Sequence, residues 1–417
     1  MKNRPNTYII NKVPFGGERM GKVIYWFKDF FKGTDKILLG LCMVLSAIGT
    51  VMVYSATRIN LTEDQVISRD AKTMFLAVVM GICVALVISY FDYEAVARLW
   101  PIIAIVCLGL MLSLFVIGSS PEGRDDAISW IKLGSFYFQP SELLKIGFII
   151  TFSVHLDTVG SEINKLKNVI LLGIHAMIAV GLVVLTGDMG SALVFMFITI
   201  GMLFMAGLQL RYFLFGIGAI GLLAPIAWFE VLSDFQKQRF MAIYSPSSLT
   251  EATYNEVIFQ QERGMNAISS GGAFGAGLFN GTYTQNGLVP ESENDMIFSV
   301  VGEELGFVGA LVVLGLLLAI AIKILFVGKK AVSVTGKLIC CAVAVMIITQ
   351  VVVNVGMCLK LLPVVGITLP FMSAGGSSNL CIYIAIGMVL SVYRSSQFRE
   401  PIEFKYGKLF TPFSQTY

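Results

Sequence analysis

Long apolar stretches alternate with short polar ones along most of the chain. Ten of these stretches resemble membrane-spanning helices, which need about 17–25 mainly apolar residues. They cover residues 37–56, 73–91, 98–118, 141–157, 168–186, 189–207, 212–232, 297–326, 338–358 and 378–394. The pattern predicts an all-α integral membrane protein with ten transmembrane helices and one large loop, 233–296, between the seventh and the eighth.

Lysine and arginine gather on one side of the predicted spans. Residues 1–36 carry eight of them, residues 323–337 carry four, and the segment after residue 393 carries four more. Short connections on the same side add Arg98, Lys165, Lys167 and Arg211. Because cytoplasmic loops are rich in lysine and arginine, we expect both termini in the cytoplasm. A basic segment, 1–36, would precede the membrane domain, 37–394, and a tail, 395–417, would follow it.

The loop 233–296 should then lie on the extracytoplasmic face. It carries three basic residues but seven acidic ones, and no histidine. The two histidines of the chain, His155 and His175, stand alone on apolar helices, where core packing is the expected role. Acid–base chemistry on the outer face must therefore use carboxylates.

The composition supports a membrane protein and excludes other classes. The chain is 56% hydrophobic and only 14% charged, against roughly 25% charged residues in soluble domains. Its net charge of +3 is too small to indicate nucleic acid as a partner. The seven cysteines lie in apolar runs without C-x-x-C spacing, so we interpret them as packing thiols and predict no metal site. The sequence implies no cofactor and leaves open whether a divalent cation takes part.

Charged residues inside the predicted spans are costly, by about 2.5–3.5 kcal/mol each on insertion scales, and therefore suggest function. Lys145 lies one turn into the fourth span, Asp188 lies between the fifth and sixth, and Glu303 and Glu304 lie near the start of the eighth. Lys145 and Asp188 are expected to act in a site or to support one. For Lys360, at the end of the ninth span, an interfacial position or a structural ion pair is the favoured interpretation.

Four segments together resemble one known family. They are FQPSELLK (138–145), GDMGSAL (187–193), ENDMIFSVVGEELGFVG (293–309) and NVGMCLKLLPVVGITLPFMSAGGSS (354–378). In this order, and over nearly the whole chain, they are similar to the SEDS family of FtsW, RodA and SpoVE. The stretch TDKILLGLCMVLSAIGTVMVYSATR (34–58) looks more like RodA than FtsW.

The resemblance implies a peptidoglycan glycosyltransferase of the bacterial cytoplasmic membrane that serves cell elongation or division. Members of this family extend a growing glycan strand from lipid II, a disaccharide-pentapeptide on undecaprenyl pyrophosphate. Their partner is a class B penicillin-binding protein, which supplies transpeptidation. In the reaction a sugar hydroxyl displaces pyrophosphate with inversion, and a carboxylate acts as general base.

In the family the base is an aspartate of the large loop, and here this sequence departs from the pattern. The aspartate position falls near Thr253, and the nearest acids are Glu251 and Glu256. We expect Glu256, with Glu251 as the alternative, to act as the base, unless both are ordinary solvated charges. Ser129 stands where the family usually has an arginine, which adds the alternative of weak or lost catalysis.

Other residues match the family motifs and carry expected roles. Lys145 and Arg239 are expected to hold pyrophosphate, since ammonium and guanidinium groups suit it, and Asp295 is expected at the substrate. Structural support is expected from Glu142, Asp188, Glu291 and Glu303.

The stretch LPFMSAGGSSNL, residues 369–380, joins the last two predicted spans. Gly375 and Gly376 allow the backbone to turn sharply. Ser377 and Ser378 then begin the last span, where a helix start favours anions. We expect the stretch either to help seat the lipid headgroup or pyrophosphate, with these serines in contact, or to form a rigid re-entrant brace supported by the glycines.

Two other functions remain compatible with these features. A lipid II flippase or another lipid transporter also needs ten or more helices and buried charge, but predicts comparable polar groups at both faces. A scaffold that activates a class B penicillin-binding protein without catalysis of its own would agree with the missing aspartate and with Ser129.

Overall fold

The computed structural model describes residues 33–61, 65–120, 127–134 and 136–398. The predicted terminal segments, 1–36 and 395–417, lie almost wholly outside these residues.

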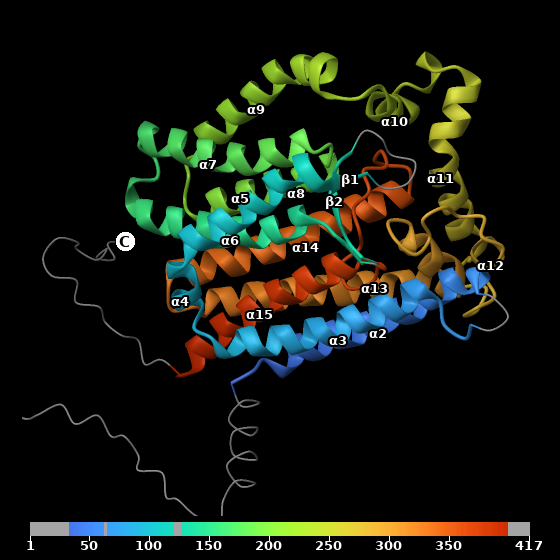
Figure 1. Ribbon diagram of the computed structural model, residues 1–417, viewed down its shortest axis with the longest axis horizontal. Coiled ribbons are helices and arrows are strands. Elements are labelled where there is room, and N and C mark those ends of the chain that lie inside the picture. The colour runs from blue at the N-terminus through green and yellow to red at the C-terminus, as the bar shows by residue number, and fades with distance from the viewer. Residues whose placement is uncertain (1–32, 62–64, 121–126, 135, 399–417) are drawn as a thin grey trace, which may run out of the picture.

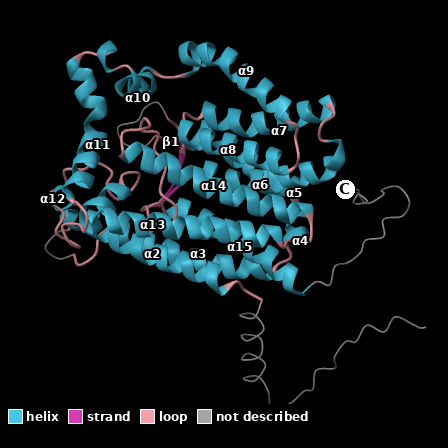
Figure 2. Cartoon of the chain, turned by 180° about the vertical axis from the view of Figure 1, so that it is seen from behind, coloured by secondary structure: helices cyan, strands magenta, loops and turns pink. Residues whose placement is uncertain are grey.

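The described chain forms a bundle of long helices that run side by side (Figure 1). The long helices are α2 (Lys36–Thr57), α3 (Arg69–Tyr90), α5 (Trp100–Ile117), α6 (Pro140–Val159), α7 (Leu166–Leu185), α8 (Met189–Met205), α9 (Leu210–Ile226), α13 (Ile297–Lys329), α14 (Val334–Cys358) and α15 (Gly376–Phe398). Shorter helices are α4 (Tyr93–Arg98), α10 (Asp234–Tyr244), α11 (Glu251–Ser270) and α12 (Thr282–Gln285). Single turns are η1 (Arg58–Asn60), η2 (Gly160–Glu162), η3 (Ala227–Val231) and η4 (Pro246–Ser248). Helices α10, α11 and α12 lie at one end of the bundle, which we call the loop end (Figure 2).

Each of the ten predicted apolar stretches coincides with one long helix. Within the described residues, nine helices are long and apolar enough to cross a membrane. The tenth, α8, is apolar but has only 17 residues. The expected class, a helical membrane protein, is confirmed, whereas the number of ten crossings stays a prediction.

A small antiparallel sheet joins α5 to α6 and adds to the predicted all-α pattern. Its strands are β1 (Gly118–Ser119), β2 (Trp130–Leu133) and β3 (Phe136–Phe138), in the order β1-β2-β3. Ile131 of β2 stands opposite Gly118 on one side and Phe138 on the other. Strands this short carry too little alternation to be found from the sequence.

Side-chain caps determine where several helices begin. Asp35 accepts hydrogen bonds from the backbone N–H groups of Ile37 and Leu38 at the start of α2. The same carboxylate lies 2.9 Å from Lys323 Nζ on α13. Ser68 and Ser333 cap α3 and α14 in the same way. Such caps satisfy backbone amides that a helix start leaves unpaired.

Helices α14 and α15 form the centre of the bundle. They are the most buried of the candidate spans; α14 packs on α13, α8 and α6, and α15 packs on α3. Helix α9 is the opposite case, because none of its residues is buried within the described chain. Figure 1 shows α9 at the edge of the bundle, so it contributes little to the core.

Helix α13 is kinked where it meets the loop end. Gly306 has φ 69° and ψ −171°, a conformation that glycine adopts without a steric penalty. A Cβ atom at Gly306 would lie 2.2 Å from the backbone nitrogen of Gly275, and one at Gly302 would lie 2.9 Å from Ile268 on α11. The two glycines therefore permit a close approach of α13 to the large loop.

Candidate functional site

A buried ion pair lies at the start of α6. The Nζ atom of Lys145 is 2.7 Å from Oε1 of Glu142, one turn earlier, and the lysine side chain is only 2% exposed. An unpaired ammonium would be very unfavourable at this depth, whereas a paired and hydrogen-bonded one retains its charge. Lys145, predicted as an intramembrane cation, therefore lies beside a carboxylate of its own helix.

Asp188 connects the starts of α6 and α8. Its Oδ1 caps α8 by accepting from the backbone N–H of Ser191 at 3.0 Å. Its Oδ2 accepts from the amide of Gln139 at 2.8 Å and from the hydroxyl of Ser141 at 2.9 Å. Three donors thus satisfy this carboxylate, and they hold the two helix starts together.

The segment between α14 and α15 is tied to its surroundings by buried hydrogen bonds. The Asn354 amide of α14 donates to the carbonyl oxygens of Asp295 and Ile367, both at 2.8 Å. The Ser373 hydroxyl donates to the carbonyl of Asn294 at 2.6 Å. The segment therefore contacts the end of the large loop and also α14.

The left-handed turn in this segment falls at Phe371, which has φ 65°. Gly375 and Gly376 do not have positive φ values, and Gly376 begins α15. The turn was expected at these two glycines, so this detail of the interpretation was wrong. Phe371 also lies close to α2, since a Cβ atom at Gly49 would lie 2.5 Å from the Phe371 carbonyl oxygen.

The two serines at the start of α15 have different surroundings. The hydroxyl of Ser378 is 2.9 Å from that of Thr368. The hydroxyl of Ser377 is buried and has no hydrogen-bond partner among the described residues. Ser377 therefore keeps an unused donor and acceptor inside the protein.

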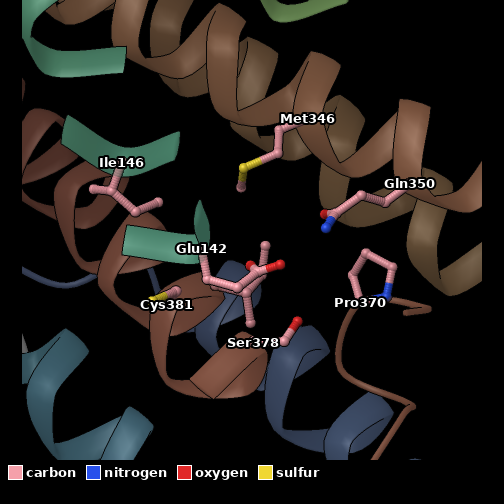
Figure 3. Close-up of a pocket in the computed structure, with 8 residues that line it drawn as sticks. Glu142, Ile146, Met346, Gln350, Pro370, Ser378 and Cys381 are labelled. Carbon is pink, nitrogen blue, oxygen red and sulfur yellow. The ribbon is translucent and has the colours of Figure 1, made fainter. Parts of the chain in front are cut away.

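A small pocket lies between α6, α14, α15 and the segment that precedes α15 (Figure 3). Its lining consists of Glu142, Ile146, Met346, Gln350, Pro370, Ser378, Cys381 and Ile382. Figure 3 shows the polar ends of Glu142, Gln350 and Ser378 directed toward its interior. The cavity volume is about 10 Å³, close to the minimum that one water molecule needs. A sugar or a phosphate is too large for it.

The two expected bases, Glu251 and Glu256, lie on α11 at the loop end. Both are exposed, and neither makes an ion pair within the described residues. Helix α11 packs on α13 and α14, whereas the buried ion pair belongs to α6. The structure therefore leaves both glutamates in solvent, apart from the buried polar residues Glu142, Lys145 and Asp188.

The other loop residues singled out from the sequence lie in three different settings. Arg239 on α10 donates to the carbonyl of Val364 at 3.1 Å. Asp295 is 8% exposed, and it accepts from the amide of Gln260 at 3.2 Å. Glu291 is exposed and has φ 53°. Arg239 thus joins α10 to the segment before α15, and Asp295 joins the end of the large loop to α11. Glu291 faces solvent in a tight turn.

Glu303 and Glu304, at the start of α13, are both buried. The Glu303 carboxylate accepts from the backbone N–H groups of Tyr283 and Thr284 and from the Thr284 hydroxyl, at 2.6, 2.9 and 2.6 Å. Glu304 accepts from the Ser55 hydroxyl of α2 at 2.6 Å. These contacts bind the end of the large loop and α2 to α13, which is a structural arrangement.

Sequence reasoning missed several uncharged polar residues. Gln350 and Asn354 lie one turn apart inside the apolar run of α14. The amide of Gln261, on α11, donates to the carbonyl oxygens of Met357 and Leu362, both at 2.8 Å. An amide in an apolar run carries no charge that would mark it in the sequence, although it is also costly to bury unpaired.

The two histidines were expected to stand alone, which was wrong, and to pack in the core, which the edge-on contacts of His175 with Phe148 and Phe152 support. Their Nδ1 atoms are 3.1 Å apart. His175 Nε2 is 3.2 Å from the Thr151 hydroxyl. Sequence separation concealed the pair, because it forms only when α6 packs against α7.

Glu293 is a further buried acid of the large loop. Burial raises the pKa of its carboxyl, and the nearby carboxylates of Glu291 and Asp70 act in the same direction. Its backbone carbonyl accepts from the N–H of Ala374, in the segment that precedes α15, at 2.8 Å. The sequence showed Glu293 only as one of seven loop acids.

The fold and these contacts define a class of protein. The chain is a multi-pass helical membrane protein in which buried polar side chains connect the helix starts to a partly helical loop. Residues 35–398 match the family FTSW_RODA_SPOVE, described as cell cycle proteins. The chain belongs to this family, as the resemblance of its motifs predicted.

Similar proteins extend this assignment. The chain is 29% identical over 361 residues to peptidoglycan glycosyltransferase MrdB of Escherichia coli (strain K12), a match that covers 86% of this chain and 94% of that protein. It is 32% identical over 366 residues to a probable peptidoglycan glycosyltransferase FtsW of Trichlorobacter lovleyi, which covers 86% and 92%.

A solved structure has the same fold. It is a chain from a peptidoglycan synthase complex described as coordinating polymerization and crosslinking. The TM-score is 0.74 at 27% identity, and the match covers 88% of this chain and 99% of that one. Because proteins named FtsW and MrdB both match, the closer likeness to RodA stays a prediction.

Proposed function

We propose that this chain is a peptidoglycan glycosyltransferase that extends a glycan strand from lipid II. The observation that carries the proposal is the family match over residues 35–398. Relatives that match nearly end to end are named as peptidoglycan glycosyltransferases. The protein acts in the bacterial cytoplasmic membrane, with 1–36 and 395–417 in the cytoplasm and the loop 233–296 on the outer face.

The reaction needs a base for the attacking hydroxyl and cations for the departing pyrophosphate. We assign the base to Glu256, with Glu251 as the alternative, because both carboxylates are exposed on α11 where a headgroup can reach them. Lys145 and Arg239 hold the pyrophosphate, since fixed positive charge stabilises the charge that develops on a leaving group. Asp295 contacts the substrate.

Further substrate contacts come from Ser377 and Ser378. The unused hydroxyl of Ser377 supports this assignment, as does its place at the start of α15. The remaining residues support the site structurally: Glu142, Asp188, Glu291, Glu303, Gly375 and Gly376.

The partner is a class B penicillin-binding protein, which crosslinks the strands that this chain polymerises. Support comes from the similar fold in a complex that combines polymerization with crosslinking.

The test is polymerisation of lipid II by the purified complex of this chain with its penicillin-binding protein. Glycan products are separated on a gel for the wild type, Glu256→Ala, Glu256→Gln and Glu251→Ala. Loss of a general base lowers the rate by about 10²–10⁴-fold, so both Glu256 variants should fall in this range. Glu162→Ala serves as a matched control, because Glu162 is an exposed glutamate paired with Lys165, outside the large loop.

Equal polymer from all variants would exclude Glu251 and Glu256 as the base. A folded wild-type complex that makes no polymer would instead favour a scaffold that activates the penicillin-binding protein. Two observations favour this second function. No aspartate stands near Thr253, where the family has its base, and the neighbouring glutamates, Glu251 and Glu256, are exposed.

A further inference from the structure

The pocket in Figure 3 contains a buried amide oxygen without a partner. Gln350 is 3% exposed, and its Oε1 makes no hydrogen bond to any described residue. A buried carbonyl oxygen in this condition is unfavourable unless water or a ligand donates to it. The amide points into the pocket that Glu142 and Ser378 also line.

The size and chemistry of the pocket select its occupant. Its volume of about 10 Å³ is near the lower limit for a single water, which also needs two to four polar partners. The Gln350 oxygen and the Glu142 carboxylate are acceptors, and the Ser378 hydroxyl is a third polar group on the wall. A molecule with two donors satisfies both acceptors at once.

A cation is a poor alternative in this position. The carboxylate of Glu142 is already neutralised by Lys145 at 2.7 Å, so a second positive charge beside it would be repelled by the ammonium. An anion would meet the carboxylate itself. Neutral water therefore agrees best with the charges around the pocket.

We propose that one water molecule in this pocket bridges Gln350 on α14 to Glu142 on α6, and that Gln350 thereby positions Lys145 for the lipid pyrophosphate. Gln350 is a positioning residue, since it acts on Lys145 through the water and Glu142. The second half of the proposal rests on the proposed function, because it names lipid II as the ligand.

The position of Gln350 on α14 explains why this link is useful. Asn354, one turn farther along, ties α14 to the large loop through Asp295 and to the following segment through Ile367. Gln350 extends the same polar face of α14 by one turn, toward α6. A water there connects the Glu142–Lys145 ion pair to α14, which is itself tied to the large loop. Lys145 therefore keeps its position when the substrate binds.

The first test observes the water directly in a high-resolution map of the full chain in its complex. The wild type should show ordered density between Gln350 and Glu142. The Gln350→Leu variant should lose that density. Thr349→Val is the matched control, because it removes a polar group from a buried neighbour on α14 that does not line the pocket. A wild-type pocket without density would overturn the proposal.

The second test measures the affinity for lipid II, which does not depend on turnover. Residues that orient metal ligands weaken metal binding about 10–100-fold when they are lost, and by analogy Gln350→Leu should raise the Kd for lipid II by about tenfold. Thr349→Val should leave Kd unchanged within about twofold. Thermal melting of each variant confirms that it is folded.

A double-mutant cycle separates positioning from a general packing effect. In the Glu142→Gln/Lys145→Met background the ion pair is absent, so Gln350→Leu should raise Kd by less than about twofold. The same tenfold effect in both backgrounds would overturn the link to Lys145. A wild type that binds lipid II but makes no polymer would contradict the proposed function alone and leave this inference standing.

Discussion

Several polar residues in this bundle contact a residue on another element. Lys360 is an example, since the pair with Glu262 at 3.2 Å agrees with the structural interpretation of its charge. Asp188 likewise connects α6 to α8. At the residue scale, polar side chains of the described chain therefore hold helices and loop in position, in addition to forming the candidate site.

The buried pair Glu142–Lys145 offers a direct test at this scale. Lys145→Met leaves a buried carboxylate without its counter-ion, and breaking such a pair costs about 3–5 kcal/mol. The double variant Glu142→Gln/Lys145→Met removes both charges and should recover most of this loss. Thermal unfolding in detergent measures both. Equal stability of the single and double variants would contradict a tightly coupled pair.

Glu293 predicts a pH dependence of stability. Its folded pKa is raised by burial, so its charged form is disfavoured in the folded state. The contribution of Glu293 to the free energy of unfolding is fully present below the pKa of an unfolded glutamate, about 4.3. It is lost as pH rises through the pKa of Glu293 in the folded state.

Glu293→Gln should therefore be more stable than the wild type at neutral pH. The two should converge near pH 4, because the wild-type carboxyl is then protonated in both states. Melting temperatures measured across this range test the prediction, with Glu256→Gln as an exposed control that does not act on the pKa of Glu293. A constant difference at all pH values would count against it.

At the scale of elements, close backbone contacts determine how the segment before α15 is held. The turn at Phe371 lies directly against α2 at Gly49. The kink at Gly306 lies in the same way against residues 273–275 of the large loop. Small residues on the long helices thus allow irregular backbone to pack inside the bundle.

Two glycines of α2 should respond in opposite directions to alanine. Gly40 has no atom within 4 Å of its Cβ position, so Gly40→Ala should gain about 0.5–1 kcal/mol from helix propensity. Gly49→Ala would place a Cβ atom 2.5 Å from the Phe371 carbonyl, and such overpacking costs about 1–3 kcal/mol. Thermal unfolding compares the two on one helix. Stabilisation by Gly49→Ala would show that the segment before α15 is not held against α2.

At the scale of the whole molecule, polar structure is unequally divided between the two ends of the bundle. The large loop with α10, α11 and α12 lies at one end, and the connection between α6 and α7 lies outside it. The charge pattern assigns the loop end to the outer face. An acceptor strand and a lipid headgroup both lie on that face in the proposed function.

Cysteine labelling tests this orientation. Ser247, in the large loop, and Ser161, between α6 and α7, are both exposed. In a Cys83→Ser background, Ser247→Cys in spheroplasts should react with a membrane-impermeant maleimide. Ser161→Cys should react only after the membrane is permeabilised. The reverse pattern would invert the proposed topology.

The sequence was sufficient for features that depend on local composition. It located the ten long helices, because a bilayer requires long apolar segments whatever their neighbours are. It also singled out Lys145 as a charge inside an apolar run, and both Glu142 and Lys145 as residues of a family motif, although their ion pair was seen only in the structure. The family motifs then indicated the class of reaction.

Only the tertiary structure decided which distant side chains meet. The pairing of His155 with His175 and the turn at Phe371 depend on how helices pack. The unpaired amide of Gln350 beside Glu142 likewise appears only when α14 and α6 lie together. These features arise from contacts between elements far apart in the chain, which hydropathy and spacing along the sequence do not encode.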